Sequence, residues 1–300
     1  MNEILKFNIQ DFRFEAIYSE IKSLLGRESI SLLILKGPHL AHSIYEKPSE
    51  RIYGDLDLLV KPESFKKAAK ILRANNFTLI EESDEKLATN AQTNHWMFRS
   101  RFGQLIELHR GFVGLRRHQC DLGSWFTRAE TFNFGNTPAL GLATEDLLCH
   151  LCLHIGKSFF YLIEEKHIRD LDRVIRKRGI QWDIFFKRCR ETHSKAIAYY
   201  CLQSTQARYD TPIPTEVFDI LRPSRMRRFW LEKHLDINVF PIYRFHALCY
   251  MHARRRLTLP LLDGIWNWGA LLARALAVKG MDVVLRFPVF KKWWKKRHVL

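Results

Sequence analysis

The segment RIYGDLDLLV at residues 51–60 places two carboxylates inside an apolar run that has the length and composition of a buried strand. Side chains alternate between the two faces of a strand, so Asp55 and Asp57 point to one face while Leu56 and Leu58 point into the core. Burying two like charges side by side is costly. A divalent cation is the simplest partner that offsets this cost.

The segment LIELH at residues 105–109 has the same alternation, with Glu107 on the polar face. If this strand neighbours the first, Glu107 joins Asp55 and Asp57 in one cluster. Three carboxylates on adjacent strands form an oxygen-rich site for Mg²⁺ or Mn²⁺. Two such ions stabilise the attacking and leaving oxygens of a phosphoryl displacement. The alternative is a pair of exposed acids on an edge strand, because Asp-x-Asp alone is a common pattern.

Upstream, a predicted strand over 31–37 ends in Lys36 and Gly37, and Pro38 opens a predicted helix. Glycine lets the backbone approach a phosphate closely, and a helix N-terminus offers free N–H groups. Lys36 adds a positive charge. We therefore expect Lys36 and Gly37 to contact the triphosphate of a nucleotide.

Two further residues flank the aspartates. Arg51 either neutralises triphosphate charge or pairs with Glu50 or Asp55, and Gly54 keeps the entry to the strand open. Of the nearby histidines, we expect His109 to be structural, whereas His95 on the other arm of the predicted hairpin is a candidate to face the site.

The N-terminal part alternates between helical and extended patterns, which predicts an α+β domain with a mixed sheet over residues 1–140. We expect helices over 11–26, 38–46 and 62–77, strands over 31–37, 54–60 and 77–82, and a hairpin over 95–110 that turns near Phe102 and Gly103. The helix over 62–77 has an apolar stripe made of Phe65, Ala68, Ala69 and Leu72.

From residue 141 the pattern is helical, which predicts a helical domain over 141–285 followed by a basic aromatic tail over 286–300. Helices are expected over 143–157, 160–178, 181–192, 195–208, 214–221, 224–235, 242–256 and 261–279. His150 and His154 share one helical face, which we expect beside the active site. In HIRDLDRVI, an Arg-Asp element over 169–172 is expected to form an ion pair that orients its helix against the catalytic domain.

Charge is distributed unevenly: residues 1–110 carry a net charge of +1 and residues 111–300 a net charge of +15. This asymmetry favours a polyanion partner, which is a nucleic acid, a nucleotide phosphate or an anionic membrane surface. The basic segments are 222–229, 252–257 and the tail, whose tryptophans suit either base stacking or a lipid headgroup region. The alternative is a solvated basic surface.

Cys149 and Cys152 form a C-x-x-C without the second pair that a zinc site needs, so we expect a buried reduced thiol pair in a helix. The N-terminus lacks the apolar core of a signal peptide, and no apolar run has the length of a membrane span. The longest, 265–278, is read as a core helix, with an interfacial helix as the alternative. These observations predict a cytoplasmic protein, with peripheral contact to a membrane as an option.

Together these segments resemble the DNA polymerase β-like nucleotidyltransferase superfamily, and within it a bacterial group of uncharacterised nucleotidyltransferases. The matching segments are ILKGPHLAHSIY, RIYGDLDLLV and LIELHR, and more loosely LLCHLCLHIGK and HIRDLDRVI. The chain departs from the wider superfamily at the phosphate loop, where classical members carry Gly-Ser and this chain has Lys36, Gly37 and Pro38. That loop is similar to the one in the subgroup of abortive-infection-type toxins.

The resemblance implies a mixed-sheet catalytic domain followed by a helical domain. It implies Asp55 and Asp57 as metal ligands, and Glu107 as the third acid that binds a second ion and helps to deprotonate the acceptor hydroxyl. The implied reaction is metal-dependent transfer of a nucleoside monophosphate from an NTP, with release of pyrophosphate. The resemblance does not identify the acceptor, which is a tRNA, a protein, a peptide or a small molecule. The alternative is a non-catalytic accessory protein that binds nucleic acid or an anionic membrane.

Overall fold

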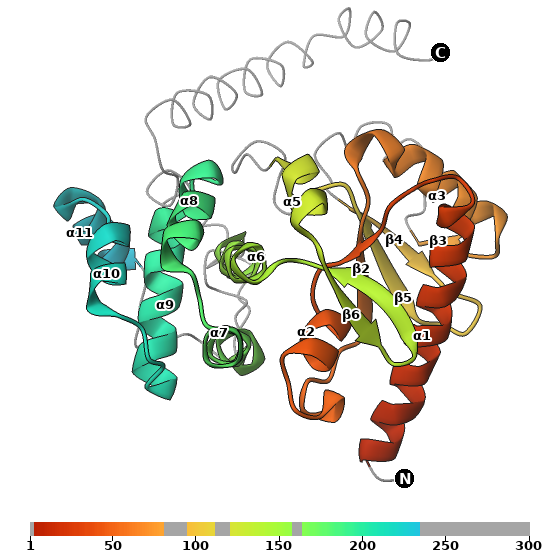
Figure 1. Ribbon diagram of the computed structural model, residues 1–300, viewed down its shortest axis with the longest axis horizontal. Coiled ribbons are helices and arrows are strands. Elements are labelled where there is room, and N and C mark those ends of the chain that lie inside the picture. Colours follow the sequence, from red (N-terminus) through yellow and green to blue (C-terminus); the bar gives the residue numbers. More distant parts are fainter. Residues whose placement is uncertain (1–2, 81–94, 112–120, 158–163, 235–300) are drawn as a thin grey trace, which may run out of the picture.

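The computed structural model describes residues 3–80, 95–111, 121–157 and 164–234 (Figure 1). Its N-terminal part is built on a seven-stranded mixed sheet with strand order β3-β4-β5-β2-β1-β7-β6. β2 runs parallel to β5 and β1 parallel to β7, while the other neighbours are antiparallel. The strands are β1 (Leu33–Ile34), β2 (Asp55–Leu59), β3 (Thr78–Leu79), β4 (His95–Arg99), β5 (Leu105–His109), β6 (Glu130–Phe134) and β7 (Thr137–Gly141). The α+β fold with a mixed sheet is therefore confirmed.

Two helices, α1 (Glu3–Gly26) and α3 (Phe65–Ala74), pack on the apolar face of this sheet. α3 buries the predicted stripe and follows a short 3-10 turn, η2 (Pro62–Ser64). α1 begins earlier than the predicted residue 11, because Phe7 continues the helical spacing of Phe14 and Ile21 into the same core. Leu56, Leu58, Val60, Ile106 and Leu108 supply the sheet side of that core.

The remaining N-terminal elements differ in part from the predictions. The predicted strand over 31–37 pairs only at Leu33 and Ile34, after which the chain passes into α2 (Pro38–Ser43) with its proline at the first helical position. A further 3-10 turn, η1 (Pro48–Glu50), precedes β2. The hairpin of β4 and β5 turns at Gly103 as predicted, with a φ of +87°. The hairpin of β6 and β7, which follows the short helix α5 (Leu122–Arg128), was not predicted.

The helical part follows the predicted pattern closely. Its helices are α6 (Thr144–Lys157), α7 (Glu165–Arg178), α8 (Trp182–Glu191), α9 (Lys195–Tyr209), α10 (Thr215–Leu221) and α11 (Arg225–His234). Cys149 and Cys152 are free and buried within α6, as predicted. The predicted helices over 242–256 and 261–279, the basic segment 252–257 and the tail lie outside the described residues.

A second core joins this helical part to the other face of the sheet. It contains Leu33 and Leu59 of the sheet together with apolar residues of α6, α7, α8 and α9. Leu59 lies on the same face of β2 as Asp55 and Asp57, since the three alternate with Leu56 and Leu58. The aspartates therefore point toward the side on which the helices pack. None of the helices in the described part of the chain is long and apolar enough to cross a membrane.

Candidate active site

Parallel pairing of β2 with β5 brings the predicted acids together. Asp57 lies directly beside Glu107 in the register, and Asp55 lies beside Leu105. Because residues two apart on a strand share a face, all three carboxylates project from the same side of the sheet. We name Asp55, Asp57 and Glu107 the acidic cluster.

Asp57 is the most deeply buried member of the acidic cluster, with no exposed side-chain surface. Lys36 Nζ lies 2.8 Å from Asp57 Oδ2, and His109 Nε2 lies 3.0 Å from Asp57 Oδ1. Burial on its own would raise the pKa of Asp57, but the charges and hydrogen bonds of Lys36 and His109 outweigh it and hold that pKa well below its usual range. Asp57 is therefore ionised at neutral pH.

Glu107 shares His109 with Asp57. His109 Nε2 lies 3.2 Å from Glu107 Oε2. Burial would lower the pKa of His109, yet its bonds to the two carboxylates raise it, and in return the pKa of Glu107 falls below its ordinary value despite burial. We expect His109 to be structural, and as a buried histidine it bridges two acids of the cluster through Nε2. Its position two residues after Glu107 on one strand was the signal that could have found it.

His95 lies on the neighbouring strand β4, opposite His109 in the register, with the two rings 5.0 Å apart between centroids. One ligand atom each of His95, Glu107 and His109 can be chosen so that all lie within 4.8 Å of one another. This position beside Glu107 and His109 agrees with the expectation that His95 faces the site.

Asp55 is only partly buried and differs from Asp57 in its surroundings. Burial, followed by the charge of Asp57, raises the pKa of Asp55, while Lys36 acts in the opposite direction. Lys36 and His109 thus keep Asp57 ionised, whereas Asp55 lies beside the like charge of Asp57. A bound cation would relieve this repulsion.

β1 and β2 are antiparallel neighbours, so the end of β1 lies beside the start of β2. The loop at Lys36 and Gly37, which follows β1, therefore borders the acidic cluster. Gly37 has a φ of +57°, and a Cβ there would lie 3.5 Å from the Cβ of Tyr53. Gly54 has open space where a side chain would project. The structure places the ammonium group of Lys36 on Asp57, and its contact with a triphosphate stays a prediction. The charges of Asp57 and Asp55 raise the pKa of Lys36 although burial opposes them.

Arg51 pairs with neither Glu50 nor Asp55. Its guanidinium donates from Nε to Asp170 Oδ1 at 2.6 Å and from Nη2 to Asp170 Oδ2 at 2.8 Å, and from Nη1 to the carbonyl of Ile52 at 2.7 Å. Both side chains are buried. Asp170 of α7 thus binds Arg51, which agrees with the ion pair predicted for the Arg-Asp element. Of the two interpretations of Arg51, pairing with Glu50 or Asp55 is wrong.

The start of α7 also lies near the acidic cluster. The charge of Lys166 lowers the pKa of Asp55 as a smaller effect. Burial, followed by the charge of Lys166, lowers the pKa of His167 to about 4, so this imidazole is neutral at pH 7. His154 of α6 lies 5.3 Å from His167 between ring centroids. The face with His150 and His154 therefore reaches α7, and His167 is a neighbour that the sequence did not reveal.

A family model described as "Uncharacterised nucleotidyltransferase" matches residues 3–210. Nothing among the curated proteins matches the chain.

Three solved structures resemble the chain distantly. The antibiotic-resistance factor ANT(2'')-Ia has 11% sequence identity and a TM-score of 0.40 over 67% of this chain and 95% of that chain. The lincosamide antibiotic adenylyltransferase LnuA has 12% identity and a TM-score of 0.35 over 52% and 93%. An antigenic nucleotidyltransferase-like protein from Paracoccidioides brasiliensis has 15% identity and a TM-score of 0.39 over 69% and 91%.

Proposed function

The chain belongs to the uncharacterised nucleotidyltransferase family, and on this premise we propose that it transfers a nucleoside monophosphate from an NTP to an acceptor hydroxyl in a reaction that needs a divalent cation. The acceptor oxygen bonds to the α-phosphorus, the bond to the β-phosphate oxygen breaks, and pyrophosphate leaves. The observation that carries the proposal is the pairing of β2 with β5, which gathers the three acids on one face.

The donor chemistry of the acidic cluster fits Mg²⁺ or Mn²⁺. Both ions prefer carboxylate oxygens, and the cluster offers three carboxylates from two adjacent strands. We propose Asp55, Asp57 and Glu107 as the ligands. A bound ion would neutralise the charge that develops on the attacking and leaving oxygens.

The remaining residues of the site position and balance charge. Glu107, whose pKa is lowered, is ionised at neutral pH and accepts the proton of the acceptor hydroxyl. Lys36 and His109 each contact one carboxylate oxygen of Asp57 and so hold that side chain in place. Gly37 leaves the backbone beside Asp55 open to a phosphate group.

The helical part completes the proposed site. The Arg51–Asp170 ion pair fixes α7 against the segment that precedes β2, which brings Lys166 and His167 toward the acids. We propose that the helical domain over 141–285 shapes one wall of the substrate site. Arg51 therefore acts as a positioning residue, and no phosphate contact is assigned to it.

Calorimetry with Mg²⁺ and each of the four NTPs tests the proposal. The variant Asp55→Asn/Asp57→Asn should lose metal-dependent NTP binding while keeping the wild-type circular dichroism spectrum. The matched control is Asp183→Asn/Asp219→Asn, which removes two exposed carboxylates of the helical part and should bind as the wild type does. Unchanged binding of Mg²⁺ and NTP in the first variant contradicts the proposal.

The acceptor is identified by transfer of label. The protein is incubated with α-labelled NTPs, Mg²⁺ and a cell extract separated into tRNA, protein, peptide and small-molecule fractions. Label should appear in one fraction with the wild type and the control, and in none with Asp55→Asn/Asp57→Asn. Label transfer that survives in that variant would place the chemistry elsewhere.

A further inference from the structure

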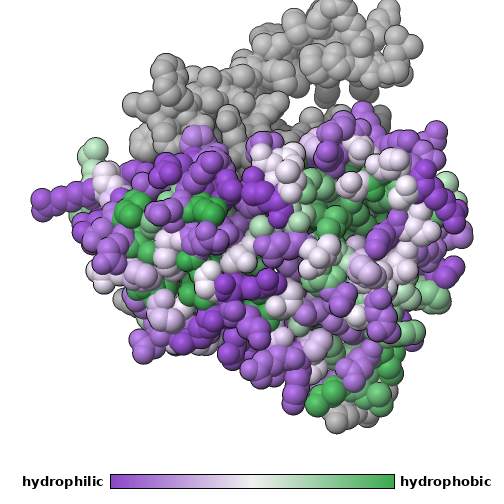
Figure 2. Space-filling view, viewed as in Figure 1, coloured by the Kyte–Doolittle hydropathy of each residue, from purple (hydrophilic) through white to green (hydrophobic). Residues whose placement is uncertain are grey.

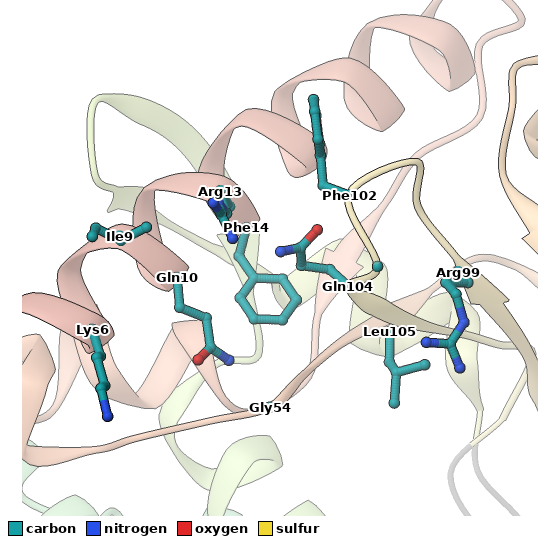
Figure 3. A pocket seen from close by; sticks show the side chains of 11 residues that line it. Lys6, Ile9, Gln10, Arg13, Phe14, Gly54, Arg99, Phe102, Gln104 and Leu105 are labelled. Carbon is teal, nitrogen blue, oxygen red and sulfur yellow. The ribbon is translucent and has the colours of Figure 1, made fainter. Parts of the chain in front are cut away.

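A cleft of about 490 Å³ opens between the N-terminal half of α1 and the turn that joins β4 to β5 (Figure 3). Lys6, Gln10 and Arg13 line it from one stripe of α1, because residues three, four and seven positions apart share a helical face. Arg99 and the turn residues line the other side, and Gly54 lies at its base.

The charged lining of the cleft is entirely positive. Lys6, Arg13 and Arg99 face it, and no aspartate or glutamate lines it. Within the described residues, none of these three cations forms an ion pair. Like charges gathered around a concave surface repel one another, and an anion that enters between them relieves the repulsion.

The cleft also has an apolar lining. Phe14 is fully buried at its wall, while Phe102 on the turn is 57% exposed although it is large and aromatic. Leu105 adds an aliphatic surface beside Gly54. Figure 2 shows that hydrophobic surface continues over the first turns of α1, where Ile4, Leu5, Ile9 and Phe12 are exposed. A ligand with an anionic group and an apolar or aromatic portion matches both parts of this lining.

The cleft lies at the end of the sheet where β2 and β5 begin. Its α1 side packs on the face opposite the acidic cluster, whereas Arg99 and Leu105 share the face of that cluster. Leu105 is the partner of Asp55 on one side and of Arg99 on the other, so these three residues form one row across β2, β5 and β4. Strands lie about 4.8 Å apart, which places the backbone of Arg99 about 10 Å from that of Asp55 on the same face. If Arg99 binds an anionic group of the acceptor, a spacer of a few bonds fits between that group and a hydroxyl of the same molecule beside the acids.

The predicted phosphate loop lies on the opposite side of β2. Lys36 and Gly37 follow β1, whereas the cleft borders β5 and β4, and the strand order runs β4-β5-β2-β1. A triphosphate at Lys36 and a ligand in the cleft would therefore approach Asp55 from two different sides. That is the arrangement that in-line transfer between two substrates requires.

Resting on the proposed function, we propose that this cleft is the acceptor subsite and that the acceptor carries a phosphate or carboxylate group next to an apolar or aromatic portion. Arg99 binds the anionic group on the side of the cleft that lies toward Asp55, Lys6 and Arg13 add positive charge along α1, and Phe102 and Leu105 contact the apolar portion. The hydroxyl that receives the nucleotide then lies toward Asp55 and Glu107.

Calorimetry on the full chain with phenyl phosphate, benzoate and phenol tests the proposal, with and without Mg²⁺ and α,β-methylene-ATP. The variant is Arg13→Gln/Arg99→Gln. The control is Arg27→Gln/Arg190→Gln, which removes the same charge from exposed arginines that do not line the cleft. The anionic probes should bind the variant about tenfold more weakly per lost charge-assisted hydrogen bond, with the control unchanged. Phenyl phosphate or benzoate, whichever binds more tightly, identifies the anionic group.

The nucleotide analogue separates this proposal from the proposed function. Both substrates should bind together, and Arg13→Gln/Arg99→Gln should leave the affinity for Mg²⁺ and the analogue within about twofold of the control. Competition between the anionic probes and the analogue, or equal probe binding to variant and control, overturns the acceptor assignment. If the wild type binds no nucleotide but still binds phenyl phosphate through these arginines, the proposed transfer fails and the cleft is an anion site of another kind.

Discussion

Replacing Asp170 by alanine should destabilise the fold more than any surface substitution, because it leaves a buried cation alone. The Asp170 carboxylate accepts two hydrogen bonds from the Arg51 guanidinium, at 2.6 and 2.8 Å, and one from the Tyr45 hydroxyl at 2.7 Å. The side chains of Arg51 and Asp170 are only 5% and 1% exposed. Water therefore cannot replace the lost carboxylate without a rearrangement of the core.

The magnitude follows from the kind of pair. Removing one partner of a buried ion pair costs about 3–5 kcal/mol, since the other charge stays buried and unpaired. The double variant Arg51→Met/Asp170→Leu removes both charges and should recover most of that loss. It still leaves the Tyr45 hydroxyl without its acceptor, which costs about 1–3 kcal/mol. Asp219→Ala is the matched control, because its partner Arg222 is 50% exposed and surface pairs contribute at most about 1 kcal/mol.

Urea unfolding at pH 7, followed by circular dichroism, measures the free energy of unfolding of the four proteins. The expected order of stability is wild type, Asp219→Ala, the double variant and then Asp170→Ala. If Asp170→Ala loses no more than Asp219→Ala, the pair does not hold α7 to the segment before β2. A double variant less stable than Asp170→Ala would refute the argument from the unpaired charge.

Three further predictions concern buried groups. Burial, followed by the charge of Arg178, lowers the pKa of His39 from 6.5 to about 3. As the pH falls, His39 is therefore protonated in the unfolded chain before it is protonated in the folded protein, so its contribution to the free energy of unfolding is complete above pH 6.5 and decreases toward pH 3 by at most about 1.4 kcal/mol per pH unit. In urea unfolding, His39→Leu should flatten this pH dependence. Gly141→Ala should lower the melting temperature, because the added Cβ would lie 2.4 Å from His39 Nε2 and crowding of this kind costs about 1–3 kcal/mol. Gly37→Ala should lose about 1–2 kcal/mol at its φ of +57° and reduce nucleotidyl transfer, whereas Gly26→Ala, which meets nothing within 4 Å, should do neither.

The parts of the fold that could be predicted are those whose pattern is repeated along a single element. β2 alternates apolar and acidic residues, and α3 repeats its apolar residues at helical spacing, so each shows its buried face in a few residues. In the hairpin of β6 and β7 the first segment, ETFNF, alternates phenylalanine with polar residues, but its partner TPALG contains proline and glycine and shows no such alternation. A second local signal is the two-residue turn Gly135-Asn136, with a φ of +57° at the glycine.

Whether a contact of the site could be predicted depends on how far apart its two residues lie in the sequence. Glu107 and His109 are two positions apart, so their shared face follows from strand geometry once the strand is assigned. By contrast, 119 positions separate Arg51 from Asp170, and nothing near either residue indicates the pairing. The sequence therefore offered Arg51 only a triphosphate or its neighbours Glu50 and Asp55 as partners, and tertiary packing of α7 supplied a different one.

The same ion pair connects the sheet to the helices that pack on the face of the acids. Asp55 and Asp57 project from the face on which the helical part packs, and Arg51, four residues before Asp55, is held by the side chain of Asp170 in α7. This contact positions the first turn of α7, whose Lys166 acts on the pKa of Asp55. Residues 3–210, which the family model matches, extend from α1 through α9 and so include both ends of this connection. A sheet without α6 and α7 would keep the carboxylates but lose the wall that faces them.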